Sequence, residues 1–473
     1  MNFSVIMDAI TNGVGKINDA MSYILVVVLV VGGLYFTLST KFVQFRRFKQ
    51  QVKSIMERPA DGKGVSSFQA LIVSTASRVG TGNIIGVSTA ICLGGYGAVF
   101  WMWIMAIVGG ASAFAESTLA QIYKKKGKDG CYGGPAYYIE STLRSRPLAI
   151  IFTIFLMLTY GFGFNMLASY NLQATFSTYS FYNVEYTPWI IGFILAVLVG
   201  YCMLGGGKRI IKVTEFLVPV MGVIYILVAI AVVVINFKVI PGIISKIFAD
   251  AFDFKSIFGG ISGSCMMYGI KRGLFSNEAG VGSAPNASAA AEVSHPVKQG
   301  LVQVLSVFID TLLVCTATAF LCLCSGVEPA AEISGAPYVQ QSMSITLGSI
   351  GPVFLTVAMI LFAFTTLLGN LYYVDKSYNY LLGREPGKKF MNTAHVISAV
   401  IVFIGSGLNA DLLWGIADIT MAGMTLINIP VILILGKYVR RALNDYDMQL
   451  RAGKNPTFTR KSIGLDKELD YWN

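Results

Sequence analysis

The sequence carries little charge for its length. Only 13% of its 473 residues are Asp, Glu, Lys or Arg, whereas 55% are hydrophobic. A soluble protein of this length needs more charged side chains to cover its surface. The composition therefore argues against an ordinary soluble protein and predicts an all-α polytopic membrane protein.

Histidine and paired cysteines are also scarce. The two histidines, His295 and His395, lie far apart in the sequence, and the seven cysteines form no C-x-x-C pair. The residue types of a zinc site or a disulfide framework are therefore not grouped. We expect free, mostly buried thiols and no cofactor.

Eleven apolar segments are each long enough to cross the hydrocarbon core of a bilayer, which takes about 20 residues. The first segment has no basic stretch before it and no small-residue cleavage site after it, so we expect a retained helix and not a signal peptide. The predicted segments are residues 20–40, 66–92, 97–123, 147–177, 188–205, 212–236, 256–290, 298–325, 339–375, 390–407 and 411–437.

Basic residues are divided unequally between the two sides that these segments define. Of the 36 Lys and Arg residues, 29 fall on one side, 4 on the other, and 3 within segments. Because cytoplasmic loops carry the excess of Lys and Arg, the bias predicts an external N-terminus and a cytoplasmic C-terminus. It also explains the net charge of +11 without a nucleic-acid partner and is compatible with contacts to anionic membrane lipids.

Two of the segments contain patterns that do not suit a continuous helix in lipid. The second contains "SRVGTGN" at residues 77–83, and the seventh contains "GIKRGLFSNEAGVGSAPNASAAA" at residues 269–291. Glycine weakens helices, and charged groups are costly at membrane depth. Irregular backbone is tolerated there only inside protein or beside a wet cavity, so both patterns predict a broken helix.

The positions of the two breaks predict an inverted repeat. Without the first segment, the remaining ten form two groups of five, each opening on its broken helix. Because five is odd, the groups run in opposite directions, and the paired breaks mark a binding site near the membrane midplane. We expect an extra N-terminal transmembrane helix (1–45), a basic cytoplasmic connection (46–65), two repeats (66–240 and 241–437) and a cytoplasmic tail (438–473).

The first break has the features of a site for a carboxylate and a cation. Unwinding at residues 79–83 would free N–H groups at the positive end of a new half-helix, where a carboxylate fits. Freed carbonyls near Ala76 and Val79 could coordinate sodium, and the hydroxyls of Thr365 and Thr366 could complement them. The alternatives are that the glycines only allow close helix packing and that the threonines bond to their own helix. A dinucleotide loop is excluded because G-x-G-x-x-G fails at Ile85.

Other polar features are open to more than one interpretation. Arg78, Glu116 and Asp310 lie within predicted segments, and Arg78 could neutralise Glu116, Asp310 or Glu278. The stretch "YGGPAYYIE" predicts a short interfacial helix on the cytoplasmic side. The tail after Lys437 is polar, and we expect it to be solvated at the membrane surface.

Several stretches resemble the alanine/glycine:cation symporter family over nearly the whole chain. They are "SRVGTGNIIGVSTAI", "GGPAYYIE", "KRGLFSNEAGVGSAPNASAAAEVSHPVKQGLVQ" and "AFTTLLGNLYY". The resemblance implies a leucine-transporter-like five-plus-five inverted repeat with an extra N-terminal helix. It also implies sodium-driven uptake of a small neutral amino acid of the alanine, glycine or glutamine class.

Carried over by position, the resemblance assigns the site residues. The substrate carboxylate would lie near the N–H groups of Thr81 and Gly82, with Asn83 beside them. Sodium would bind the carbonyls of Ala76 and Val79 and the hydroxyls of Thr365 and Thr366. The opposite wall of the substrate site would be formed by Phe275, Ser276 and Asn277.

Two positions depart from the family pattern. Ala168 stands where these carriers usually have glutamine, and Asn370 where they often have tryptophan. Both changes remove side-chain volume from the expected pocket. Together with Arg78, which resembles the glutamine-type branch, they predict a substrate larger than alanine.

The sequence leaves alternatives within transport and excludes others. A proton-coupled carrier or a sodium-independent exchanger is the main alternative to sodium symport. An enzyme is not expected, because no nucleophile–base pair or ligand set lies at membrane depth. A discrete amino-acid site argues for a carrier over a channel. The amino-acid side chain, the ion stoichiometry and the oligomeric state remain open, and a monomer is compatible with the sequence.

Overall fold

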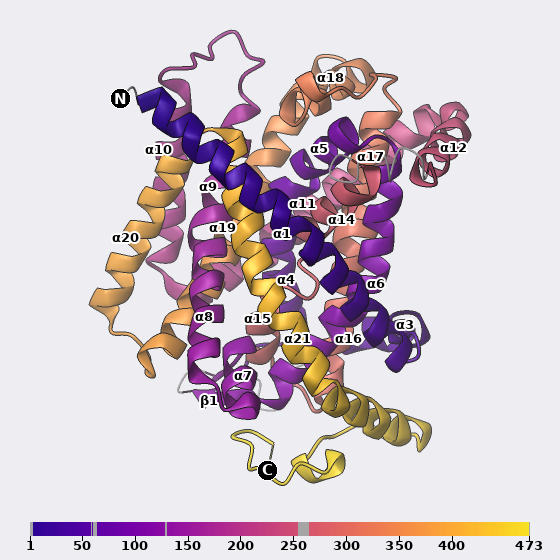
Figure 1. Ribbon diagram of the computed structural model, residues 1–473, viewed down its shortest axis with the longest axis vertical. Helices are drawn as coiled ribbons and strands as arrows, with labels where there is room; N and C mark the ends of the chain where they lie inside the picture. The colour runs from indigo at the N-terminus through magenta and orange to yellow at the C-terminus, as the bar shows by residue number, and fades with distance from the viewer. Residues whose placement is uncertain (1–2, 58, 60–63, 128–129, 254–263, 473) are drawn as a thin grey trace.

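The computed structural model describes residues 3–57, 59, 64–127, 130–253 and 264–472. The described chain is helical apart from one small antiparallel hairpin, β1 (Lys125–Gly127) and β2 (Gly130–Tyr132). The two termini lie at opposite ends of the molecule (Figure 1). The helices are α1 (Phe3–Ser39), α2 (Val43–Arg46), α3 (Phe48–Ile55), α4 (Ser67–Arg78), η1 (Thr81–Asn83), α5 (Ile85–Gly94), α6 (Gly97–Ile122), α7 (Pro135–Leu143), α8 (Arg146–Met157), η2 (Leu158–Gly163), α9 (Phe164–Ala174), α10 (Thr187–Met203), α11 (Gly206–Ile235), η3 (Phe237–Val239), α12 (Ile240–Ala251), α14 (Cys265–Asn277), α15 (Pro285–Ala290), α16 (Pro296–Val307), η5 (Phe308–Cys315), α17 (Thr316–Leu323), η6 (Ala331–Ile333), α18 (Ala336–Leu347), α19 (Ile350–Leu382), α20 (Lys388–Gly405), α21 (Ala410–Arg451) and η7 (Arg460–Ile463).

Long apolar helices form most of the molecule. Within the described residues, seven helices are long and apolar enough to cross a membrane. Outer helices such as α10 and α11 expose large apolar side chains, including Phe193, Phe216 and Leu227, which suits contact with lipid. The seven helices are Ala9–Ser39, Gly97–Ile122, Arg146–Ala174, Gly206–Ile235, Pro296–Leu323, Ile350–Leu382 and Ala410–Arg451.

Both predicted breaks are present, and the two broken helices lie side by side in opposite directions. The second predicted segment divides into α4, η1 and α5, and the seventh contains α14 and α15 with irregular backbone between them. A Cβ on Gly94, at the end of α5, would lie 2.8 Å from Cβ of Tyr268, near the start of α14. At the opposite end, Val65 before α4 forms a parallel bridge with Ala291 after α15.

Glycines make the second break possible. Glu278 ends α14 in the left-handed region, and Gly280 and Gly282 follow with φ of 84° and 93°. Two of these three positions are glycine, the residue that adopts positive φ without steric cost. All three are buried, so this irregular backbone is enclosed by protein, as its place in a membrane protein requires.

The predicted segments differ from the helices in several places. The ninth, 339–375, was wrong as one span, because it combines parts of α18 and α19, which Gly348 separates at φ 64°. The first helix begins earlier than residue 20, and residues 256–263 of the seventh segment lie outside the described residues. The fourth and eighth each contain a π-helical stretch, η2 and η5, that hydropathy does not predict. A short helix is present where one was predicted, as α7, and its position at the membrane interface stays a prediction.

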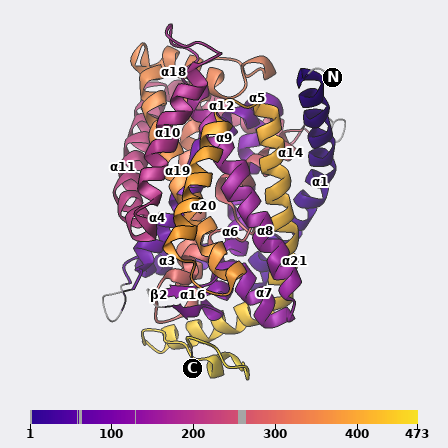
Figure 2. The same cartoon turned by 90° about the vertical axis from the view of Figure 1, so that its left-hand side faces the viewer.

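The extra N-terminal helix, α1, packs along α21, and the views in Figures 1 and 2 agree on this. A Cβ on Gly32 would lie 2.6 Å from Cγ2 of Ile429, so this glycine lets the two helices approach closely. Nearer the N-terminus of α1, Asn18 donates a hydrogen bond to Asp418 of α21. The contact between α1 and α21 is therefore both apolar and polar.

The C-terminal tail is not the solvated segment that its composition predicts. Helix α21 continues beyond residue 437 to Arg451, and the chain then folds back under the base of the molecule (Figure 1). Phe458, Leu465, Leu469 and Trp472 are buried. The prediction of a solvated tail was wrong because isolated apolar residues between charged ones give no strong hydropathy signal, although together they form a docking surface.

Candidate functional site

The first break leaves main-chain groups unpaired. Asn83 Oδ1 accepts a hydrogen bond from the Gly80 N–H at 2.8 Å and so fixes the loop between α4 and η1. Among the described residues, the N–H groups of Thr81 and Gly82 donate no hydrogen bond, and the carbonyls of Ala76 and Val79 accept none. Buried main-chain groups are nearly always paired, so four such groups at one break indicate a binding site.

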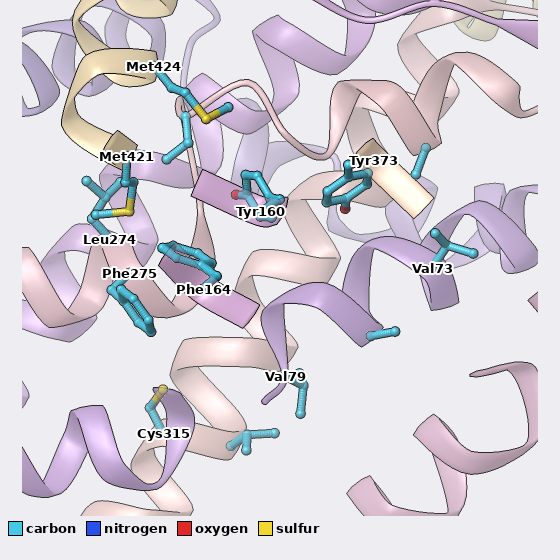
Figure 3. Packing of buried hydrophobic residues seen from close by; sticks show 14 of the residues in the cluster. Val73, Val79, Tyr160, Phe164, Leu274, Phe275, Cys315, Tyr373, Met421 and Met424 are labelled. Carbon is cyan, nitrogen blue, oxygen red and sulfur yellow. The ribbon is translucent and has the colours of Figure 1, made fainter. Parts of the chain in front are cut away.

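A small buried cavity lies against this loop. Its volume is about 10 Å³, which is room for one water molecule. Phe164 and Phe275 cover the cavity with ring centroids 4.5 Å apart, and Figure 3 shows them side by side. The cavity is lined by Ser77, Arg78, Gly80, Thr81, Gly82, Phe164, Phe275 and Thr366.

Three predicted substrate residues therefore line the cavity, and the others lie around it. Thr81, Gly82 and Phe275 line it, whereas Asn83 and Ser276 lie outside the lining. The Asn83 Nδ2 donates to Ser276 Oγ at 2.9 Å, which joins the first break to the end of α14. Asn277 Oδ1 accepts from the Ala279 N–H and shapes the second break.

The two positions that depart from the family pattern are buried close to the cavity. Ala168 lies one helical turn after Phe164 on α9, and Asn370 lies one turn after Thr366 on α19. Asn370 Oδ1 accepts from Ser77 Oγ at 2.7 Å, and its Nδ2 donates to Asn165 at 3.0 Å. The Asn370 side chain therefore links α19 to α4 and α9.

The four predicted cation ligands differ in how free their oxygens are. The Thr365 hydroxyl donates to the Leu361 carbonyl at 2.9 Å, the bond within its own helix that threonine commonly makes. The buried Thr366 hydroxyl has no partner among the described residues and lines the cavity. With the carbonyls of Ala76 and Val79, it forms a set of unpaired oxygens at the first break.

Two glycines bring α19 and its Thr366 close to the break. A Cβ on Gly80 would lie 1.9 Å from Thr366 Oγ1. A Cβ on Gly369 would lie 2.6 Å from the Ser77 nitrogen, a main-chain atom that cannot move aside alone. Glycine at both positions therefore allows the approach of α19 to the loop.

Arg78 is not paired with a carboxylate among the described residues. Its Nη1 donates to Gln303 Oε1 at 2.9 Å, while Nε and Nη2 are buried without a partner. Glu116 instead accepts hydrogen bonds from Gly280 and Asn428, and Glu278 from Ser77 and Ser283. A buried, unpaired guanidinium beside a cavity is costly unless a ligand or a nearby charge compensates it.

Asp310 connects the two breaks from a third helix. It lies on η5, where its carboxylate accepts from Asn83 Nδ2 at 2.6 Å, Ser276 Oγ at 2.7 Å and Thr311 Oγ1 at 2.8 Å. All three donors are neutral, and the described residues give Asp310 no ion pair. Because π-helical turns often mark functional sites, a buried carboxylate there is a candidate for binding a proton or a cation.

A charged cluster above Phe275 was not found from the sequence. Arg272 of α14 forms an ion pair with Asp418 of α21 at 2.9 Å, and its guanidinium lies 4.1 Å from the Trp414 ring centroid. The Phe275 and Trp414 rings are 4.8 Å apart. These groups pack against Phe275, which lines the cavity, and nothing in the sequence indicated that Asp418 would meet Arg272.

Comparison with known proteins gives consistent matches over most of the chain. The sodium:alanine symporter family model matches residues 7–460. The amino-acid carrier protein AlsT of Bacillus subtilis (strain 168) is 41% identical, with 94% of each chain covered. The probable sodium/glutamine symporter GlnT of the same organism is 42% identical over 97% of this chain and 95% of its own.

Two further matches concern coupling and fold. A sodium/proton-dependent alanine carrier protein of Bacillus sp. (strain PS3) is 36% identical over 86% of this chain and 94% of its own. The crystal structure of MhsT in complex with L-phenylalanine matches with a TM-score of 0.60 at 14% identity, over 82% of this chain and 93% of that one. At this identity the match establishes a shared fold.

Proposed function

Because the chain belongs to the sodium:alanine symporter family, which is a family of transporters and not of enzymes, we propose that it imports a neutral amino acid together with sodium. The chain is a multi-pass membrane protein. We place it in the cytoplasmic membrane with the N-terminus outside, on the strength of the 29-to-4 bias of basic residues. The termini lie at opposite ends of the molecule, which supports an odd number of spans with the two termini on opposite sides of the membrane.

We propose eleven spans, arranged as an extra N-terminal helix and two inverted repeats of five. The antiparallel contact between the two broken helices supports this arrangement, because inverted repeats place their first helices in opposite directions. Transport would follow from one group of helices rocking against the other around the breaks, which opens the cavity to each side in turn.

The observation that carries the proposal is the pair of unpaired N–H groups of Thr81 and Gly82 beside a buried cavity. Such groups at the start of a half-helix bind carboxylates, and every amino acid has one. In this proposal Asn83 holds the loop and Phe275 closes over the substrate. The cavity of about 10 Å³ must enlarge to hold an amino acid, so Phe275 and Phe164 would move apart on binding.

We infer a substrate larger than alanine, of the glutamine class. Ala168 and Asn370 leave more room than the glutamine and tryptophan that the resemblance leads us to expect. The unpaired Nε and Nη2 of Arg78 offer donors to a carbonyl oxygen on the substrate side chain. A relative named as a probable glutamine symporter is 42% identical, which supports this choice.

For sodium we propose the carbonyls of Ala76 and Val79 with the hydroxyls of Thr365 and Thr366. The carbonyl oxygens of Ala76 and Val79 and the hydroxyl of Thr366 are unpaired among the described residues. The Thr365 hydroxyl would turn away from the Leu361 carbonyl when the ion binds. The ion would then hold α4 against α19. An ion that favours one arrangement of these helices over another couples its own binding to that of the substrate.

Counterflow in proteoliposomes, run across the twenty amino acids with and without sodium, tests the proposal. We expect glutamine to exchange well, and exchange to fall when choline replaces sodium. Strong transport of glycine and alanine alone would contradict the larger substrate. Transport that is indifferent to sodium would contradict sodium coupling, and ion-channel currents would contradict a carrier.

The substitution Gly82→Ala tests the carboxylate site. The added methyl group would lie 2.7 Å from Phe275 Cε1, so the ring must move into the space that the substrate needs. Overpacking of this kind costs about 1–3 kcal/mol, and we expect counterflow to fall by about fivefold or more. Gly86→Ala is the matched control on the same half-helix, because its methyl group meets no atom closer than 3.7 Å.

The substitution Thr366→Val tests the sodium site. It removes an unpaired hydroxyl oxygen with little change in shape, so the half-saturating sodium concentration should rise about tenfold. Thr153→Val is the control, since that buried hydroxyl bonds only to the carbonyl of Ala149 in its own helix. Sodium dependence that is unchanged in Thr366→Val would remove this residue from the site.

Proton coupling is a second candidate, and Asp310 is the observation that favours it. Its buried carboxylate has neutral donors only, so a proton or a cation would relieve the cost of its charge. Two relatives are named sodium/proton-dependent alanine carriers, one of them putatively.

The substitution Asp310→Asn separates the two forms of coupling. If protons drive transport, an inward proton gradient should stimulate uptake by the unmodified protein, and Asp310→Asn should abolish that stimulation because the amide cannot bind the proton. Asp411→Asn, at the exposed start of α21, is the control. Uptake by the unmodified protein that ignores a proton gradient would exclude this alternative.

A further inference from the structure

The docked tail, residues 452–472, meets the part of the protein that must open for release into the cytoplasm. We propose that this segment is a latch that holds the cytoplasmic ends of α4 and α15 together. The inference rests on the proposed alternating access, in which the cavity opens to each side of the membrane in turn. It assigns the tail to the opening on the cytoplasmic side. Three sets of contacts support it.

The first set joins the last residues of the tail to the end of α15. Trp472 Nε1 donates to the Gln121 carbonyl at 2.7 Å, and Lys124 Nζ lies 3.8 Å from the Tyr471 ring centroid. The same Lys124 Nζ donates to the carbonyl of Ala291, directly after α15, at 2.9 Å. Gln121 Nε2 also donates to the Ala291 carbonyl at 2.8 Å. Gln121 and Lys124, which the tail covers, therefore both bind the C-terminal end of α15.

Burial makes the Lys124 contact depend on the tail. Desolvation lowers the pKa of Lys124 to about 8, so its charged form needs compensation. Glu292 supplies part of it through its charge, and the faces of Tyr471 and Trp472 add cation–π contacts at 3.8 Å and 4.9 Å. Loss of the rings would expose this lysine to water and weaken its hold on the carbonyl of Ala291.

The second set joins the start of the tail to the start of α4. Lys298 Nζ forms an ion pair with Glu57 at 2.9 Å and donates to Asn455 Oδ1 at 2.9 Å. The carbonyl of Glu57 accepts from the Ser67 N–H, at the first residue of α4. Pro456 accepts through its carbonyl from Ser294 Oγ at 2.7 Å. Lys298 of α16 thus links the tail to Glu57 and, through it, to the start of α4, and Ser294 links the tail to the connection before α16.

The third set makes the tail a single unit. Phe458 packs between His295 and Trp472, with ring centroids 5.2 Å and 5.3 Å apart. The Arg460 N–H donates to the Trp472 carbonyl at 3.2 Å, which closes the segment on itself. Displacement of Trp472 would therefore also loosen the packing of Phe458 against His295, so the whole tail segment would detach together.

Hydrogen–deuterium exchange of the full chain in lipid nanodiscs tests the latch. The double variant Tyr471→Ala with Trp472→Ala should raise exchange in residues 285–298 about tenfold, as expected when a hydrogen bond and its stacked rings are lost. It should also accelerate substrate release towards the cytoplasmic side. Glu468→Ala, an exposed tail residue, is the control and should change neither.

A second variant, ending after Ala452, removes the tail outright and should give the same increase. Faster exchange of the tail itself without any change in residues 285–298 would overturn the latch, as would an unchanged result in the truncated chain. Both outcomes leave transport by the intact protein standing. Failure of the intact protein to transport amino acids would instead contradict the proposed function.

Discussion

The two helix breaks impose the main constraint on this structure, because main-chain groups freed inside a membrane protein cannot be satisfied by water. At the second break the constraint is met in part, since Glu116 and Asn428 pair with both main-chain groups of Gly280, whereas the N–H groups of Gly282 and Ser283 donate no hydrogen bond among the described residues. At the first break it is met only in part. The amides of Thr81 and Gly82 and the carbonyls of Ala76 and Val79 stay unpaired among the described residues. Both breaks therefore keep main-chain groups that a ligand or a bound water molecule could satisfy.

The buried charges around the first break follow from the same constraint. Glu278 and Glu116 are held by neutral donors, and Arg78 is held by Gln303. None of these groups forms an ion pair with another among the described residues, so the guanidinium and the two carboxyl groups each depend on neutral partners. A zwitterion and a monovalent cation are ligands that such an arrangement can accommodate, whereas an apolar solute would leave the charges uncompensated.

Much of this fold could be predicted from the sequence because hydropathy and helix-breaking residues are local signals. Gly80, Gly82 and Pro285 indicated where helices 66–92 and 256–290 would break, and both breaks are present. The π-helical stretches and the division of 339–375 at Gly348 were not predicted, because apolar composition continues through them. The tail also escaped prediction, since Phe458 and Trp472 become a buried pair only when the chain folds back.

The cavity beside the first break could be predicted in part, whereas the roles of its residues stay predictions. The glycines indicated the loop, and Thr81, Gly82, Phe275 and Thr366 do line one cavity. The contact of Asn83 with Asp310 and the ion pair of Arg272 with Asp418 join residues 227 and 146 positions apart. Such contacts depend on how helices pack, so the spacing of residues along the chain could not have indicated them.

The polar contact between α1 and α21 has a mechanical consequence. Asn18 shares the carboxylate of Asp418 with Arg272, and Gly32 fixes α1 against Ile429 further along α21. If Arg272 separates from Asp418 when the cavity opens, α21 cannot move alone, because α1 contacts it both at Asp418 and at Ile429. The N-terminal helix α1 would then move together with α21. More lipid-facing surface would move in each transport cycle than in a carrier of this fold that lacks this helix.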